Sequence, residues 1–275
     1  MSKIAINQIY YREDQLPHLD KDFIPYNNLE NLKPHLCEWY IWDKEYENSK
    51  QQHEYWGHIS WKFGEKTGLT GKQFKDWIEA NTGYDLYFVN PCIVNEAVFT
   101  NSWIQGDNCH PGISDIANSF YNRIGYKDMN VKSYILDHNR TMYANYLVGN
   151  DNFWSKFLEF TRKLFTEAEK DAGFHQAVFG AGLAGYARNR DLPMFPFLIE
   201  RLVPLFIELE KIPTLSYKYT TDTALAKYKP YFNDIMVLSA LKEQVNRHNS
   251  DELFNIYKYY AYMLVKNNPG VLNLE

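Results

Sequence analysis

Segments with the pattern of strands alternate with segments that have the pattern of helices through the first 170 of the 275 residues. This alternation constrains the fold more than any other feature of the chain. Short apolar runs predict strands over residues 3–11, 54–63, 84–89 and 142–148. Apolar residues at helical spacing predict helices over 36–47, 70–81, 113–124 and 151–165. Such a chain is expected to form an α/β fold, with a mixed, mostly parallel sheet flanked by helices.

The C-terminal part of the chain is predicted to be helical. Helices are expected over 195–210, where Pro204 predicts a kink, and over 229–247 and 251–267. The Gly- and Ala-rich residues 171–194 fit either a helix or a mobile loop. Residues 12–36 are polar, contain three prolines and are expected to be irregular, which in a compact domain is usually functional. We therefore expect one domain over residues 1–210 and a helical extension over residues 211–275 packed on it.

Charge and cysteine content exclude several classes of protein. The net charge is −5 without a basic run, so the electrostatic footprint of a nucleic-acid-binding protein is missing. No window approaches the run of about 18 apolar residues that a transmembrane helix needs. Three cysteines without metal-type spacing and an N-terminus without a signal-peptide pattern predict a cytoplasmic protein. Aromatic residues make up 17% of the chain, and their rings can pack a core or stack on sugars and bases.

Polar side chains gather after the strand predicted at 84–89, which Asn90 and Pro91 end. Trp103, Gln105, Asp107 and His110 follow within eight residues, and we expect them on a surface loop that leads into the next helix. Open α/β sheets bind ligands at the carboxyl ends of their strands. Asp107 and His110 could therefore serve as a base, a metal ligand or a contact to a sugar hydroxyl, although a tight turn with a hydrogen-bonded histidine explains the pattern equally well.

Six stretches, in order, resemble the small glycosyltransferases encoded in bacterial capsule and lipopolysaccharide clusters. They are residues 6–11, 54–63, 84–91, 105–110, 144–154 and 194–202. The resemblance spans roughly residues 4–210 and implies a GT-A-like transferase that uses a nucleotide-sugar donor, with a UDP-sugar as the first choice. The implied acceptor is a glycan or a lipid-linked glycan of a growing surface polysaccharide. A contact with the inner face of the membrane and a homodimer both stay open, and a noncatalytic carbohydrate- or nucleotide-binding accessory protein is the alternative.

The residues and the resemblance together indicate eight site residues. Catalytic roles fall to Asp107, His110 and Glu200, and contacts to the donor fall to Gln8, Tyr10, Lys62, Asn90 and Arg201. Glu200 and Arg201 interrupt an otherwise apolar helix, so a buried structural ion pair is an equally good interpretation. The chain has no Asp-x-Asp motif, and Ser60-Trp61-Lys62 stands where the family has a more basic segment. These two departures leave the use of Mn²⁺ or Mg²⁺ open, and no metal ligand is assigned.

Overall fold

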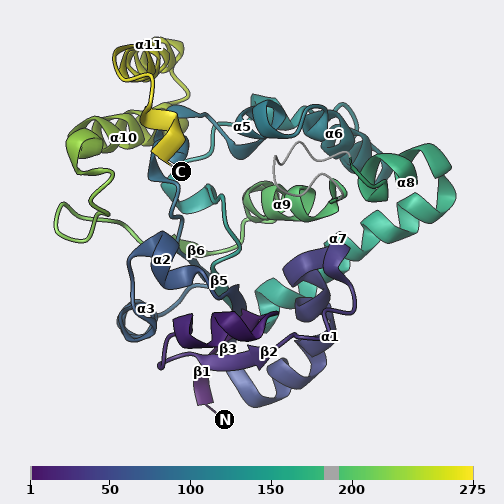
Figure 1. Cartoon of the computed structure of the whole chain (residues 1–275). Coiled ribbons are helices and arrows are strands. Elements are labelled where there is room, and N and C mark those ends of the chain that lie inside the picture. The colour runs from purple at the N-terminus through teal and green to yellow at the C-terminus, as the bar shows by residue number, and fades with distance from the viewer. Residues whose placement is uncertain (1, 183–191, 275) are drawn as a thin grey trace.

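The computed structural model describes residues 2–182 and 192–274, which contain a six-stranded sheet in the order β2-β1-β3-β5-β4-β6 (Figure 1). The strands are β1 (Ser2–Tyr10), β2 (Ile24–Asn27), β3 (His53–Ser60), β4 (Leu86–Phe88), β5 (Leu147–Gly149) and β6 (Thr214–Ser216). Strand β1 pairs in parallel with β2 and β3, and β4 pairs in parallel with β6. Strand β5 runs antiparallel to both of its neighbours, β3 and β4. The predicted α/β class and the mixed, mostly parallel sheet are confirmed.

Helices cover both faces of the sheet (Figure 1). They are α1 (Cys37–Gln52), α2 (Phe63–Thr67), α3 (Gly71–Ala80), α4 (Ile93–Val98), α5 (Ser102–Cys109), α6 (Ile113–Arg123), α7 (Asp151–Lys170), α8 (Ala172–Phe179), α9 (Phe195–Leu209), α10 (Phe232–His248) and α11 (Asp251–Asn267). Side-chain hydrogen bonds cap the N-termini of several of these helices. Thr70 and Gln73 form the expected capping box of α3, and Asn150 caps α7 through Phe153 N.

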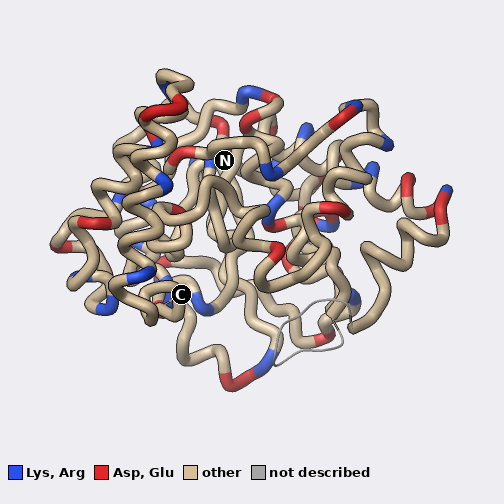
Figure 2. The backbone as a smooth tube through the Cα atoms, turned by 90° about the horizontal axis from the view of Figure 1, so that it is seen from above, with Lys and Arg blue, Asp and Glu red and all other residues tan. Residues whose placement is uncertain are grey.

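The core is divided in two by the sheet. Successive side chains of a strand point to opposite faces, and in β4 Leu86 and Phe88 join one cluster while Tyr87 joins the other. Helices α1, α6, α7 and α9 bury the first cluster, and α3, α4, α10 and α11 bury the second. Charged residues of both signs are interspersed along the chain (Figure 2). Among the described residues, no helix has both the length and the apolar character needed to cross a bilayer.

Three expectations need correction. Residues 12–36 are not wholly irregular, because β2 forms the edge of the sheet there, and its four residues with Pro25 are too short to give a strand pattern. Residues 102–109 form α5 and not a surface loop, since Asn101 Oδ1 accepts hydrogen bonds from the amides of Trp103 and Ile104, and Trp103 is fully buried. The segment 211–275 is not purely helical, because β6 extends the sheet beyond residue 210.

Smaller differences concern the ends of elements. Strand β3 stops at Ser60, since Phe63 already begins α2, and the strand expected at 142–148 is reduced to β5. Of the segment 171–194, residues 172–179 form α8, whereas residues 183–191 lie outside the described part of the chain. Helices α10 and α11 lie close to their predicted ranges and pack against α4, so the C-terminal part shares the core of the sheet.

Candidate functional site

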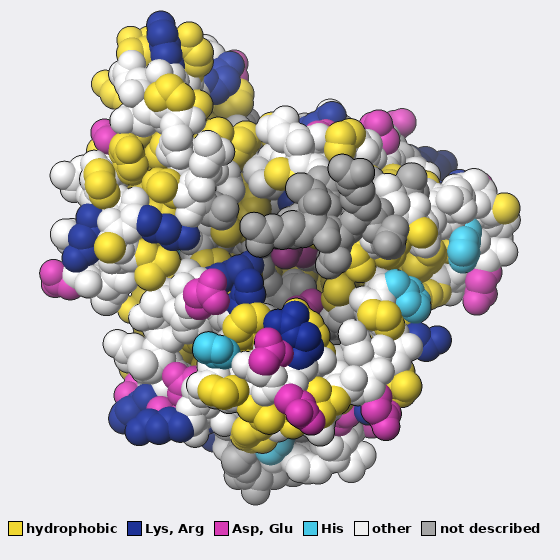
Figure 3. Space-filling model, in the orientation of Figure 1, with side chains coloured by type: hydrophobic (Ala, Val, Ile, Leu, Met, Phe, Trp, Pro, Cys, Tyr) yellow, Lys and Arg dark blue, Asp and Glu magenta, His cyan; other side chains and the backbone are white. Residues whose placement is uncertain are grey.

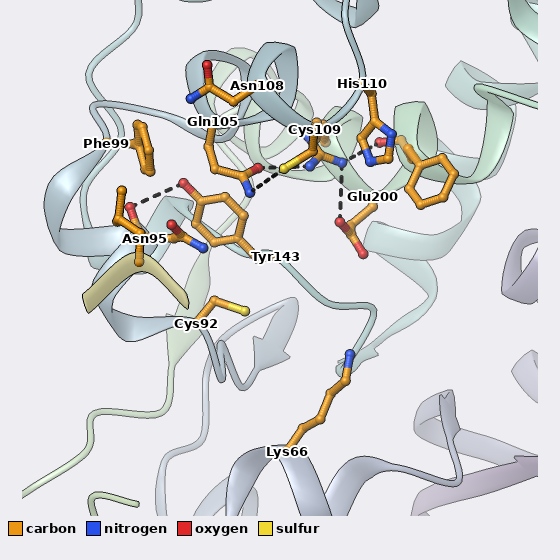
Figure 4. Close-up of a pocket in the computed structure, with 13 residues that line it drawn as sticks. Lys66, Cys92, Asn95, Phe99, Gln105, Asn108, Cys109, His110, Tyr143 and Glu200 are labelled. Atoms are coloured by element: carbon orange, nitrogen blue, oxygen red, sulfur yellow. Dashed lines mark hydrogen bonds and ion pairs between the residues drawn. The ribbon is translucent and has the colours of Figure 1, made fainter. Parts of the chain in front are cut away.

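A cavity of about 410 Å³ lies between α5, α9 and the chain around α4, and we call it the α5–α9 cavity. The face of the molecule seen in Figure 3 is hollowed near its centre. Polar and charged side chains in its lining include Lys66, Asn95, Gln105, Asn108, His110, Glu200 and Arg201. Figure 4 shows the side chains of α5 above Glu200, with Lys66 approaching from α2 on the opposite side.

Helix α9 contributes two charged side chains to this cavity, Glu200 and Arg201. Most other residues of α9 are buried and apolar, and they fix the helix against α1, α5 and α7. Arg201 is only 3% exposed. Its Nε donates to the carbonyl oxygen of Ser102 at 3.2 Å and its Nη2 donates to Gln105 Oε1 at 2.9 Å. Its Nη1 donates to the carbonyl oxygen of Phe197 on α9 at 3.2 Å, so the guanidinium group joins α5 to α9.

The close approach of Arg201 to α5 depends on Gly106. A Cβ atom at position 106 would lie 2.5 Å from Arg201 Nε, which is too short for any side chain. Gly106 occupies the middle of α5, where glycine is normally unfavourable. The absence of a side chain at this position thus allows the guanidinium group to lie against the helix.

Glu200 has the most unusual electrostatic environment in the cavity. Its carboxyl lies 3.4 Å from Arg201 Nη1, and the side chain is 23% exposed. Burial raises the pKa of Glu200 to about 7, against the opposing charges of Arg201 and Lys66 and with a further contribution from Glu38. A carboxyl with this pKa exchanges its proton readily at neutral pH, which is the property required of a general acid or base.

An aromatic wall lies beside Glu200. His110 follows the last residue of α5 and stacks on Phe197, with the ring centroids 4.0 Å apart and the planes 29° from each other. Burial, together with the charge of Arg201, lowers the pKa of His110 to about 4, so the imidazole is neutral at pH 7. Phe99 and Tyr143 add further aromatic surface on the side of α4 (Figure 4). The cavity therefore combines flat apolar faces with amides and one titratable carboxyl.

A second cavity of about 280 Å³, here called the strand-end cavity, lies at the carboxyl ends of β1 and β3. Its lining includes Tyr11, Asn28, Cys37, Glu38 and Ser60. The charge of Glu38 reaches Glu200, because it contributes to the raised pKa of that carboxyl. Each cavity thus has a carboxyl group in its lining, and the two carboxyls lie close enough for their charges to interact.

Of the eight predicted site residues, three line the α5–α9 cavity. These are His110, Glu200 and Arg201. Asp107 does not line it, although it lies on the same helix as Gln105. Its carboxylate accepts a hydrogen bond from Ser114 N at 3.2 Å and pairs with Lys132 at 3.1 Å, so it connects α5 to the start of α6. Burial raises the pKa of Asp107, but its hydrogen bonds with Ser114 and the charge of Lys132 outweigh burial and lower it.

Two predicted donor contacts at the end of β1 are structural. Gln8 is buried, its Nε2 donates to the carbonyl oxygen of Trp61 at 3.0 Å, and its Oε1 accepts from Asp20 N at 2.7 Å. Tyr10 is also buried, whereas its neighbours Ile9 and Tyr11 line the strand-end cavity. Because strand side chains alternate between faces, Gln8 and Tyr10 lie on the face of the strand opposite to the residues that line this cavity.

The remaining two predicted contacts also lie outside both cavities. Asn90 Oδ1 accepts from Cys92 N at 3.1 Å and so forms the turn that follows β4. Lys62 lies beside the ring of Trp61, with Nζ 5.2 Å from the ring centroid. Lys66, one helical turn later on α2, lines the α5–α9 cavity instead. Because β3 ends three residues earlier than predicted, the basic residue that reaches the cavity is four positions further along the chain.

Sequence reasoning missed Lys66, Asn95 and Glu38. The signal for Lys66 was its i, i+4 relation to Lys62 on the short helix that follows β3. Glu38 lies in the first turn of α1, after the segment that had been expected to be irregular and functional. Asn95 gave no separate signal, because α4 was not predicted.

A protein-held divalent metal does not fit the described residues. Within residues 2–182 and 192–274, no group of three or more His, Cys, Asp or Glu side chains is arranged to hold a metal ion. Asp107 and His110, the two residues with metal-ligand chemistry on α5, are directed to different surroundings. We therefore derive no chemical step through a metal.

Comparison with known proteins gave no relative: no model of a protein family, no curated protein sequence and no solved structure matches this chain.

Proposed function

We propose that this protein is a glycosyltransferase that moves a sugar from a nucleotide-sugar donor to a hydroxyl group of a growing surface polysaccharide. The observation that carries the proposal is Glu200, a carboxyl with a pKa of about 7 that lines the α5–α9 cavity beside Arg201 and Lys66. The resemblance of residues 4–210 to capsule and lipopolysaccharide glycosyltransferases supports it. The mixed α/β sheet is consistent with the GT-A-like architecture that we propose for this domain.

Glu200 would act as the general base. The oxygen of the acceptor hydroxyl forms a bond to the anomeric carbon of the donor sugar while the bond from that carbon to the diphosphate oxygen breaks. The hydroxyl proton passes to Glu200, and the nucleoside diphosphate leaves with the bonding electron pair. Lys66 and Arg201 line the same cavity as Glu200 and would add positive charge that stabilises the negative charge developing on the departing diphosphate.

The two cavities would divide the substrates between them. The strand-end cavity lies where open α/β sheets commonly bind nucleotides, and we assign the donor nucleotide to it, with a UDP-sugar as the first candidate. The α5–α9 cavity would take the acceptor, since sugar rings stack on aromatic faces such as Phe197 and bind amides such as those of Asn95 and Gln105. The acceptor would be a glycan or lipid-linked glycan, and the reaction would take place in the cytoplasm.

A panel of donors tests this assignment. UDP, GDP, CMP and dTDP are tested first for an increase in melting temperature, because a ligand that binds only the native state stabilises it. The corresponding nucleotide sugars are then tested for sugar release and for transfer to oligosaccharide acceptors. We expect one nucleotide to raise the melting temperature and its sugar to be transferred. If no nucleotide at millimolar concentration stabilises the protein and no donor is consumed, the noncatalytic accessory role is favoured instead.

A further inference from the structure

The last long helix, α11, forms an outer lobe of the molecule and packs mainly on α10 (Figure 1). Its inner side is buried through Tyr257, Ala261 and Leu264. Its outer side exposes four large hydrophobic side chains, and these are Ile256, Tyr259, Tyr260 and Tyr262. Residues three and four apart are neighbours on a helix, so these side chains form one continuous surface, which we call the tyrosine face.

The outer side of α11 is also positively charged. It carries Lys258 and Lys266, whose ammonium groups lie over aromatic rings of the same helix, 4.5 and 5.5 Å from the ring centroids. Within the described part of the chain, neither lysine forms an ion pair with a carboxylate. The acidic residues of α11, Asp251 and Glu252, lie in its first turn, and no Asp or Glu occurs over residues 253–274. The lobe thus presents hydrophobic and basic side chains together (Figure 3), in a protein whose net charge is −5.

Tyrosine and lysine in this combination fit a lipid–water interface better than the surface of a second protein. A tyrosine ring is apolar with a polar tip, so it lies at the level of the lipid headgroups with its hydroxyl in water. The long lysine side chains can reach anionic headgroups, which attract their charge. Protein interfaces, in contrast, are depleted in lysine. Ile256 is the one aliphatic member of the tyrosine face, so the helix is suited to lie on a membrane and not to enter it deeply.

The chain that follows α11 connects the tyrosine face to the candidate site. Val271 is fully buried and holds this segment in the core, and Leu272 lines the α5–α9 cavity. The wall of that cavity therefore lies only a few residues beyond the end of α11. A membrane bound to α11 would lie near the cavity to which we assign a glycan or lipid-linked acceptor.

We propose that α11 docks on the surface of a membrane that contains anionic lipids, with the tyrosine face in the headgroup region. The docking uses the rings and the two lysines of α11, and it does not rest on the proposed glycosyltransferase activity. Binding to vesicles without donor or acceptor therefore tests it separately from that activity. If the activity is also present, docking keeps the α5–α9 cavity close to lipid-linked acceptors.

Vesicle sedimentation with the whole protein tests the docking. Two kinds of vesicle are compared, one of phosphatidylcholine alone and one with phosphatidylcholine and phosphatidylglycerol in equal amounts. We expect binding to the anionic vesicles that weakens as NaCl is raised from about 50 to about 500 mM, because salt screens the attraction. No binding to anionic vesicles at the lower salt concentration, or equal binding to both kinds, overturns the proposal.

A charge-reversal variant locates the docking surface. Lys258→Glu combined with Lys266→Glu should weaken binding to anionic vesicles at least about tenfold. The matched control is Lys127→Glu combined with Lys163→Glu, which changes the net charge equally at exposed positions after α6 and on α7, away from α11 (Figure 1). The control should bind within about twofold of wild type. If both variants lose binding equally, net charge and not α11 drives the association.

A second variant tests the rings. Tyr259→Ser combined with Tyr262→Ser should weaken vesicle binding at least about tenfold, because less apolar surface reaches the headgroup region. Leu32→Ser is the control, since Leu32 follows β2 and is 61% exposed, and it should leave binding unchanged. All these side chains are exposed, so the melting temperatures should stay at the wild-type value.

A second copy of the chain is the competing occupant of the tyrosine face. Analytical ultracentrifugation without lipid should give the same oligomeric state for wild type and for the tyrosine variant. A wild-type dimer that the two serine substitutions dissociate, together with no binding to anionic vesicles, would assign the face to self-association and overturn the proposal.

Discussion

Glu96 and Glu200 are two carboxyl groups enclosed by this protein, and their pKa values are shifted in opposite directions. Glu96 lies on α4 and pairs with the fully buried ammonium of Lys242 at 3.0 Å. Burial alone would raise the pKa of Glu96, but Lys242, His138 and Ser239 outweigh burial and lower it. Glu200 also has a cation beside it, yet burial raises its pKa to about 7.

The difference lies in what else each cation binds. Lys242 is directed to Glu96 and to nearby backbone carbonyls, so its charge remains close to the carboxylate. Arg201 donates to Ser102 and Gln105 of α5 and to the carbonyl oxygen of Phe197, and its contact with Glu200 is longer, at 3.4 Å. A buried carboxyl thus stays ionised where a cation lies close to it, and becomes titratable near neutral pH where the cation is held further away by bonds that join two helices. The first arrangement stabilises the fold, and the second is suited to proton transfer.

The largest expected effect is on catalysis in Glu200→Gln. The amide keeps the size of the side chain but cannot accept the proton of the acceptor hydroxyl. The turnover number should fall by about 10²–10⁴, with nucleotide affinity nearly unchanged. Steady-state kinetics with the donor that the nucleotide-sugar panel identifies would measure the change in turnover number. A Glu200→Gln variant with wild-type turnover would remove Glu200 from the mechanism and with it the proposed role of the cavity.

The next largest effect is on stability in Lys242→Met. This change leaves the Glu96 carboxylate buried without its cation, and the free energy of unfolding should fall by about 3–5 kcal/mol. Chemical denaturation measures the change. The matched control is Lys72→Met, which breaks the exposed pair with Asp76 on α3 and should leave the stability within experimental error. If both variants lose the same stability, the pair of Glu96 and Lys242 does not have the role assigned to it.

The two carboxyls also predict opposite pH dependences of stability. The pKa of Glu200 rises on folding from 4.5 to about 7. The stability that Glu200 contributes to the folded state is therefore fully present below pH 4.5 and is lost as the pH rises through 7. Relative to Glu200→Gln, the wild-type protein should therefore lose on the order of 2 kcal/mol across this window. The pKa of Glu96 is lowered on folding, so its contribution is present above the ordinary value and is lost as the pH falls. Urea unfolding of both proteins at several pH values tests the first sign, and parallel curves would contradict it.

The smallest effect is expected for Asp107→Asn. Asp107 connects α5 to Lys132 and to the start of α6, and its partly exposed ion pair should contribute less than about 1 kcal/mol. Turnover should stay within about threefold of wild type, because the carboxyl does not line the cavity. A drop as large as that of Glu200→Gln would restore Asp107 to the site and contradict its placement here.

The sequence predicted the periodic elements well, because their patterns are local. The capping box at Thr70, the helix stripes and the alternation of strands with helices all depend on residues close together in the chain. Strands β2 and β6 were not predicted. They have four and three residues, which are too few to show an alternating pattern, and their pairing partners lie elsewhere in the chain. The site was predicted only in part for the same reason. Glu200 and Arg201 stood out as charges on an apolar helix, whereas Lys66 and Asn95 reach the cavity only through tertiary packing.

A titration of Glu200 itself tests the central claim most directly. The carboxyl carbon of each glutamate is followed by ¹³C NMR from acidic to alkaline pH, and the Glu200 signal is assigned from its absence in Glu200→Gln. We predict a midpoint near pH 7 for Glu200, reported by a signal that Glu96→Gln leaves in place. A midpoint at or below the ordinary value of 4.5 would show that Arg201 neutralises Glu200 as Lys242 neutralises Glu96, and would contradict the account of this cavity as a site of proton transfer.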